Sequence, residues 1–324
     1  MTSISNKIVR RARRMVRSVT HPSFLPIASY LIANPAGSSA TPPAPDVIDH
    51  PPIGPEFTTE AVASRPDIPQ NIFQTWKSRS VIPGNYMGWR TSFLAINPGY
   101  RLILWDDDDN RAFVAARFPW FLPVYDRYPK EIYRADAVRP LFLFLIGGFY
   151  ADMDSECLRP LEPLRDRADV LLGRMGWDDG FEHGVPNALM ASRPFQIFWL
   201  LYVAIMIEKA AGVSAEAMAL AGPETFTGPI ALKEAADFYR TQPDAVLDRC
   251  KPVLDALPPE WRAQVESGTL ALLEPDAWYG IDWTNPMHRR LRAKILKTQR
   301  PLDRTVALRL FPKATLITYW SHSW

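Results

Sequence analysis

The sequence predicts an α/β fold with a largely parallel sheet. Short apolar segments of strand character alternate along the chain with longer segments of helical pattern, and this alternation is typical of βαβ units. The 324 residues are 47% hydrophobic and 22% charged, an ordinary globular balance. The pattern predicts strands over 68–76, 100–105, 170–172, 187–191, 270–273 and 314–318, and helices over 86–96, 110–118, 132–146, 195–207 and 232–239.

The first part of the chain differs in composition from the rest. Residues 1–34 contain six basic residues and no acidic one, with apolar residues at helical spacing among them. This pattern predicts a basic amphipathic helix able to lie on an anionic membrane surface, although a disordered tail or a targeting peptide fits it too. Residues 35–67 are rich in proline and predict a linker or an extended arm, which leaves 68–324 as the folded domain.

Charge and cysteine content exclude several classes of protein. Without the six basic residues at the start, the chain has 31 basic against 35 acidic residues, so it is not expected to bind nucleic acid. Two cysteines, Cys157 and Cys250, are too few for a disulfide framework or a cysteine-based zinc site. Whether these two form one disulfide is left open.

The most informative stretch runs from Gly147 to Asp154. Two glycines follow an apolar run and allow a sharp or crowded turn, and the stretch ends in Asp152 and Asp154. If the backbone there is extended, both carboxylates point to the same side. Paired carboxylates repel each other and favour a hard divalent cation, here Mn²⁺ or Mg²⁺. The alternative is a solvated turn after a strand.

A second polar pair lies in the helical stretch before these carboxylates. Asp136 and Arg139 are three residues apart and share a helix face, which suits an arginine that binds phosphate and an aspartate that accepts sugar hydroxyls. A surface ion pair is the alternative. Pro140 is expected to kink or interrupt this helix. The acidic run Asp106–Asp109 is expected to cap a helix, and 195–207 to be a core helix too short to span a bilayer.

Residues 68–163 resemble glycosyltransferase family 32, whose sugar-binding region contains a D-x-D motif. The family is related to the yeast initiating mannosyltransferase and to the large glucosylating toxins. Five segments match in order and spacing, and weaker matches extend the likeness to about 68–324. The matching segments are 68–76, 97–100, 104–107, 134–136 and 147–154 with 157–161.

The resemblance implies a GT-A fold, in which a mixed but mostly parallel sheet is flanked by helices. It also implies metal-dependent, retaining transfer of a hexose from a UDP- or GDP-sugar to a glycan, lipid or protein acceptor. By this resemblance Asp154 ligates the metal directly. Asp152 contacts the ribose, the sugar or the metal through water.

The resemblance assigns donor-binding roles to further residues. Trp76 would stack on the nucleotide base. Asp136 and Arg139 would hold the sugar hydroxyls and the diphosphate, and Tyr150 would touch the diphosphate or the sugar.

The chain's C-terminal end would complete the site. Ser323 and Trp324 would close over the diphosphate. The family commonly has histidine where Phe73 and Tyr319 stand here, and His322 is a candidate replacement as a metal or phosphate ligand.

Two other functions use the same residues differently. A metal-dependent phosphohydrolase or nucleotidyltransferase also uses paired aspartates. A non-catalytic membrane-surface binding protein would need only the basic N-terminal segment and the apolar helix. For the transferase, the basic segment favours a membrane-associated location, on the cytoplasmic face in a bacterium or in the Golgi in a fungus. The donor base, the sugar and the acceptor are left open.

Overall fold

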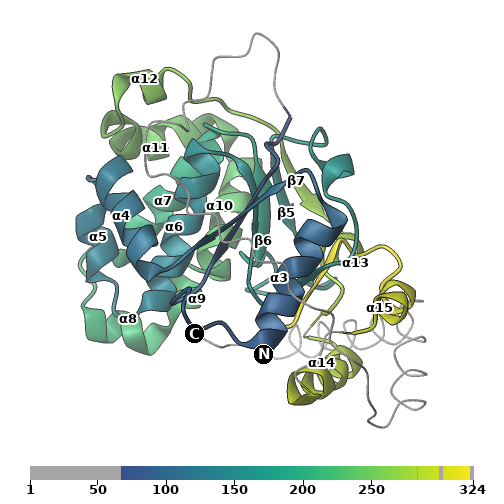
Figure 1. Ribbon diagram of the computed structural model, residues 1–324. Helices are drawn as coiled ribbons and strands as arrows, with labels where there is room; N and C mark the ends of the chain where they lie inside the picture. The colour runs from purple at the N-terminus through teal and green to yellow at the C-terminus, as the bar shows by residue number, and fades with distance from the viewer. Residues whose placement is uncertain (1–66, 283, 299–301, 322–324) are drawn as a thin grey trace, which may run out of the picture.

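The computed structural model describes residues 67–282, 284–298 and 302–321 (Figure 1). The predictions for residues 1–34 and for nearly all of the proline-rich segment 35–67 lie outside this range. Within it, the expected alternation of strands and helices is present, and each predicted strand and helix overlaps an observed one.

A six-stranded sheet with the order β2-β1-β3-β6-β5-β7 forms the centre of the molecule. Only β6 runs against its neighbours, so the sheet is mixed but mostly parallel and the predicted fold class is confirmed. The strands are short and largely apolar, as expected where both faces are covered. They are β1 Asn71–Thr75, β2 Arg101–Trp105, β3 Gly148–Ala151, β5 Val170–Gly173, β6 Leu189–Ser192 and β7 Leu270–Leu273.

Helices cover both faces of the sheet (Figure 1). Because side chains alternate along a strand, Phe73 faces one layer and stacks on Phe142 at 5.4 Å, whereas Ile72 faces the other layer with Phe93. The helices are α3 Gly84–Ile96, α4 Asp107–Arg117, α5 Leu122–Arg127, α6 Glu131–Leu145, α7 Ile197–Ala210, α8 Ala215–Ala221, α9 Pro223–Phe226, α10 Pro229–Thr241, α11 Val246–Asp255, α12 Pro259–Arg262, α13 Pro275–Trp278, α14 Pro286–Thr298 and α15 Arg304–Leu310.

Local predictions for two of these helices can be checked in detail. Asp106 and Asp109 form a reciprocal capping box at the start of α4, so the structural interpretation of the acidic run is confirmed. Helix α6 runs without a break through Pro140, so the interruption considered there is not seen.

Helix α7 is a core helix, as predicted, and ten consecutive residues from its first position are buried. Among the described residues, no single helix is long and apolar enough to cross a bilayer. Helices α7 and α8 reach that length and apolarity only as a pair bent by 114°. Both cysteines are buried and free, so Cys157 and Cys250 do not form a disulfide.

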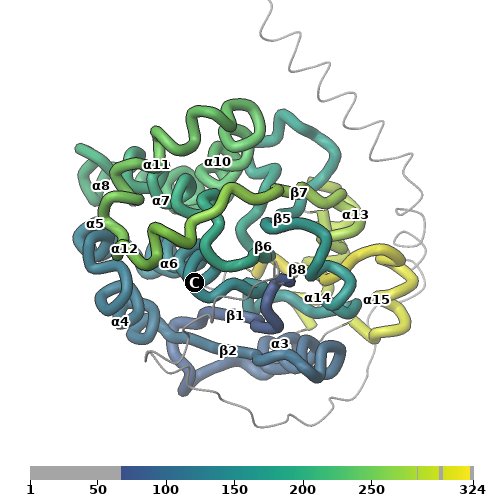
Figure 2. Tube along the Cα trace, turned by 90° about the horizontal axis from the view of Figure 1, so that it is seen from above, coloured from purple at the N-terminus to yellow at the C-terminus, as the bar shows by residue number. Residues whose placement is uncertain are grey.

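A second, two-stranded sheet joins the middle of the chain to its C-terminal part. Strand β4 (Ser155–Cys157) pairs antiparallel with β8 (Leu316–Thr318), so the predicted strand at 314–318 belongs to this small sheet and not to the central one. Figure 2 shows β8 beside α14 and α15, on the side away from α4 and α5. The pairing brings the C-terminal residues to the turn that follows β3.

We predict that Gly148→Ala destabilises the protein by about 2 kcal/mol or more. Gly148 has a φ of +114°, and a methyl group there would lie 2.6 Å from the backbone oxygen of Asn71 on β1. The matched control is Gly99→Ala, because a methyl group at Gly99 meets nothing within 4 Å. Urea unfolding of both variants checks this, and equal stabilities would contradict it.

Candidate active site

The predicted site residues gather where β1 and β3 end. Trp76 follows β1, and Asp152 and Asp154 follow β3. The carboxyl ends of parallel strands are the usual place for ligands in open α/β sheets. The extended conformation assumed for the two aspartates is not what the structure has. Strand β3 ends at Ala151, and a turn closed by the Ser155 amide on the Asp152 carbonyl, at 3.0 Å, holds both carboxylates.

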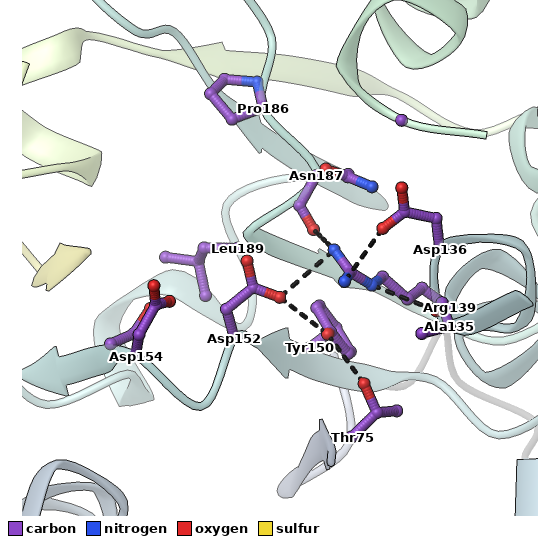
Figure 3. A network of polar contacts seen from close by, with 12 residues as sticks. Thr75, Ala135, Asp136, Arg139, Tyr150, Asp152, Asp154, Pro186, Asn187 and Leu189 are labelled. Atoms are coloured by element: carbon purple, nitrogen blue, oxygen red, sulfur yellow. Dashed lines mark hydrogen bonds and ion pairs between the residues drawn. The ribbon is translucent and has the colours of Figure 1, made fainter. Parts of the chain in front are cut away.

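Arg139 lies at the centre of a buried polar network (Figure 3). Its Nη2 is 2.9 Å from Asp136 Oδ1, and its Nη1 is 3.2 Å from Asp152 Oδ1. It also donates to the backbone carbonyls of Asn187 at 3.0 Å and Ala135 at 3.2 Å. The side chain is only 2% exposed. Arg139 therefore orients two carboxylates, and its predicted contact with the donor diphosphate stays a prediction.

Tyr150 supports the same network from β3. Its hydroxyl donates to Asp152 Oδ1 at 2.8 Å and lies 3.3 Å from the hydroxyl of Thr75, at the end of β1. The Arg139 guanidinium carbon lies 4.5 Å from the centre of the Tyr150 ring. The hydroxyl therefore fixes Asp152, and its predicted contact with a donor stays a prediction.

The electrostatics of the network favour the binding of another cation. Burial raises the pKa of Asp136 to about 6 and that of Asp152 to about 7, although Arg139 opposes both shifts. The nearby charge of Asp154 also raises the pKa of Asp152. Burial lowers the pKa of Arg139, but Asp152, Tyr150 and Asp136 raise it more, so Arg139 stays charged. Asp136 and Asp152 thus share one arginine while Asp154 adds a third negative charge nearby, and a further positive charge would relieve the repulsion between Asp152 and Asp154.

Asp154 stands beyond Asp152, away from Arg139, and contacts the C-terminal segment (Figure 3). Its Oδ2 accepts from the Ser321 amide at 2.6 Å, and its backbone carbonyl accepts from the Tyr319 amide at 2.9 Å. The Tyr86 hydroxyl donates to the Ser321 hydroxyl at 2.6 Å. Arg292 of α14 donates to the carbonyls of Tyr319 and Trp320.

These contacts were not predicted from the sequence. Tyr86 and Arg292 act on a segment far away in sequence, and nothing in their own neighbourhoods indicates it. The described part of the C-terminal segment reaches the aspartate turn through Tyr319 and Ser321. His322, Ser323 and Trp324 themselves lie outside the described residues, so their roles stay predictions.

The carboxylates fit a divalent cation bound mainly by its substrate. Asp152 contacts Arg139 and Tyr150 through Oδ1, and Asp154 accepts from the Ser321 amide through Oδ2, so each carboxylate has a second oxygen to offer a metal. No group of three or more acidic, histidine or cysteine side chains in the described part of the chain could hold a metal. Two carboxylates completed by phosphate oxygens and water suit Mg²⁺ or Mn²⁺.

Trp76 and the two family histidine positions are packed inside the protein. The Trp76 indole donates to the Val81 carbonyl at 3.0 Å, and its ring centre is 4.6 Å from that of Tyr86. The side chain is buried, so stacking on a base stays a prediction. Phe73 is a core residue, and Tyr319 is buried with its hydroxyl donating to Glu156.

Comparison with known proteins identifies this region. Residues 83–171 match the family model described as the glycosyltransferase sugar-binding region containing a DXD motif, so the resemblance found in the sequence is confirmed. The match includes Asp136, Arg139, Asp152 and Asp154.

Three relatives or solved structures illustrate the similarity. Inositol phosphoceramide mannosyltransferase 2 of Schizosaccharomyces pombe is 32% identical over 213 residues, which are 60% of this chain and 54% of the relative. Mannosyl phosphorylinositol ceramide synthase CSH1 of Saccharomyces cerevisiae is 35% identical over 152 residues, 47% of this chain and 38% of the relative. The chain spans about half, or less, of these relatives. The structure of PaToxG glycosyltransferase matches at 15% identity with a TM-score of 0.38, over 64% of this chain and 82% of that one.

We predict that Arg139→Lys lowers the free energy of unfolding by roughly 3 kcal/mol. A lysine cannot reach both carboxylates and both carbonyls, so it leaves buried charge without a partner. The exposed pair Arg111–Asp126 offers the control, and Arg111→Lys should leave stability nearly unchanged. Urea unfolding measures both, and a loss at Arg139 no larger than at Arg111 would refute the role of the network.

The buried carboxyl group of Glu156 leads to a second prediction, on how the stability of the protein depends on pH. Burial raises its pKa to about 7, although the hydrogen bond from Tyr319 and the charge of Arg304 lower it. A carboxyl group with a raised pKa stabilises the folded state fully below its unfolded pKa, near 4.5, and this contribution is lost as pH rises through 7.

We therefore expect Glu156→Gln to flatten the decline in stability between pH 4.5 and 8. The native chain should lose about 3 kcal/mol more than the variant over this range, because a glutamine cannot ionise. Urea unfolding at a series of pH values measures it. The exposed Glu260→Gln serves as the control, and parallel pH curves for the native chain and Glu156→Gln would rule the effect out.

Proposed function

We propose that this chain, whose residues 83–171 are a DXD-containing glycosyltransferase sugar-binding region, transfers a hexose from a nucleotide-diphosphate sugar with a divalent cation. The observation that carries the proposal is the Asp136–Arg139–Asp152 network beside Asp154. Its buried carboxylates can accept hydrogen bonds from sugar hydroxyls. The pair Asp152 and Asp154 also fits a metal ion that is bound to a diphosphate.

The residues of the network divide the work between them. Asp154 would hold the metal through Oδ1, and Asp152 would act through water or on the donor. When bound, the metal would supply charge stabilisation for the departing diphosphate. Asp136 accepts sugar hydroxyl hydrogen bonds, and Arg139 positions both Asp136 and Asp152. The segment at Ser321, held on Asp154, would bring the following residues over the diphosphate.

We propose retention of the anomeric configuration by a same-face reaction. The bond between the anomeric carbon and the diphosphate oxygen breaks, and the acceptor oxygen bonds to the same face of the sugar. The acceptor's hydroxyl proton goes to the leaving diphosphate oxygen. This route needs no carboxylate nucleophile on the opposite face of the sugar.

Mannose from GDP-mannose is the donor we propose first, with an inositol-containing lipid as the acceptor. Support comes from relatives whose names state inositol phosphoceramide mannosyltransferase or mannosyl phosphorylinositol ceramide synthase activity. A lipid acceptor also agrees with the basic segment 1–34, which we propose as a contact with the membrane surface.

Asp154→Asn should lower kcat for transfer and for donor hydrolysis at least about 100-fold, because the amide is a poor ligand for the cation. The assay measures release of GDP from GDP-mannose with Mn²⁺, and UDP-glucose in parallel tests the base and the sugar. Asp108→Asn, an exposed aspartate on α4, should keep full activity. Release of free phosphate without transfer of sugar would instead indicate a phosphohydrolase.

The stereochemistry has its own test. Proton NMR of the product formed from GDP-mannose should show the anomeric configuration of the donor. An inverted product would exclude the same-face reaction and leave the transferase assignment intact.

A further inference from the structure

A polar groove lies between α10 and the loop that joins β5 to β6. Two adjoining hollows of about 360 and 500 Å³ share Asp179 of the loop and Lys233 and Asp237 of α10 in their walls. The shared residues place the two hollows next to each other along α10, as one polar region of the surface. We call it the α10 groove, and define it by the residues of the loop 174–185 and of α10 that line it.

Each wall of the groove is next in sequence to a residue that lies beside the Arg139 network. The loop is closed by the Met175 amide on the Gly184 carbonyl at 2.9 Å, and shortly after it the Asn187 carbonyl accepts from Arg139. On the other wall, a methyl group at Gly228, just before α10, would lie 3.3 Å from Asp136 Oδ2. Ile230, two residues further on, already lines the groove. The segments next to both walls of the groove therefore lie beside Asp136 and Arg139.

The sheet topology places the groove at the same edge as the aspartate turn. Strands β3 and β5 both run against β6, and β7 runs parallel to β5, so β3, β5 and β7 end at one edge. Arg174 follows β5 and Glu274 follows β7, and both line the groove. Asp152 follows β3 at that edge.

The lining suits a ring with many hydroxyl groups. Within it Lys233 pairs with Asp237 and Arg174 pairs with Asp179, so hydrogen-bond donors and acceptors alternate along the wall. Carboxylates outnumber cations among the lining residues, which disfavours a phosphate as the bound group. Hydroxyl groups both donate and accept, and they match such a surface.

We propose that the α10 groove binds the acceptor of the transfer reaction, through a polyhydroxylated ring of a sugar or a cyclitol. This inference rests on the proposed transferase function. The ring would lie with its reacting hydroxyl toward Asp136, at the inner end of the groove. The rest of the acceptor would extend outward along α10.

Probe binding tests the proposal without turnover. Methyl α-mannoside and myo-inositol are titrated onto the full chain with GDP and diamagnetic Mg²⁺, and saturation-transfer NMR measures the dissociation constants. The parent should bind one of the two probes, and the identity of that probe shows whether the groove binds a sugar or a cyclitol. Asp237→Asn and Asp179→Asn should each weaken that binding about tenfold, the loss expected for one charge-assisted hydrogen bond.

Asp248→Asn provides the matched control, because Asp248 is exposed on α11 and does not line the groove. It should bind the probe as the parent does, and thermal unfolding should show all variants folded. Binding of neither probe, or binding that the two groove variants leave unchanged, would overturn the proposal. Hydrolysis of GDP-mannose by the parent is measured separately, and its absence would count against the proposed function and not against the groove.

Discussion

The burial of Arg139 is the constraint on which the site depends. A guanidinium that is 2% exposed is stable only where carboxylates and carbonyls surround it. Here α6 contributes two such groups, and the turn after β3 and the segment before β6 contribute one each. None of these elements can shift without breaking a buried contact. The apolar half of α6, from Pro140 to Leu145, is buried against the sheet and α7 and holds the arginine at this depth.

The two aspartates of the turn contact different parts of the molecule. Asp152 faces inward and is fixed by Arg139 and Tyr150. Asp154 faces the C-terminal segment and contacts Ser321. The turn therefore joins a rigid, buried network to a segment held by a few hydrogen bonds. Such a division suits a site whose donor must be oriented on one side and enclosed on the other.

The sequence predicts what local patterns determine. The alternation of apolar and helical segments was sufficient to predict the fold class. Asp106 indicates the start of α4, because the hydrogen bonds of a helix cap lie within one turn of the chain. Asp136, Arg139, Asp152 and Asp154 were found because they lie close together in the chain, and the structure brings them into one region. Their chemical roles still await the experiments above.

The features that could not be predicted from the sequence depend on contacts between segments that are distant in the chain. The turn at Asp152 replaces a strand because β4 must leave the central sheet to pair with β8. The roles of Tyr86 and Arg292 and the presence of the α10 groove could not be predicted from local sequence patterns. Each depends on contacts between residues that are far apart in the chain. Helices α5, α8, α9 and α11 to α15 were also missed, because several of them are short and the tertiary contacts that stabilise them are not local.

The pairing of β4 with β8 has a consequence for biosynthesis. The Ser155 and Thr318 hydroxyls lie 3.0 Å apart across 163 positions of sequence, and Asp154 meets Ser321 across 167. During translation the Arg139 network can assemble once β6 has emerged from the ribosome, whereas Asp154 has no settled partner until the last strand follows. Contacts of such separation form late in folding. The nascent protein thus has its sheet and its arginine network before its aspartate turn is complete, and the turn gains its contacts only when synthesis has passed β8.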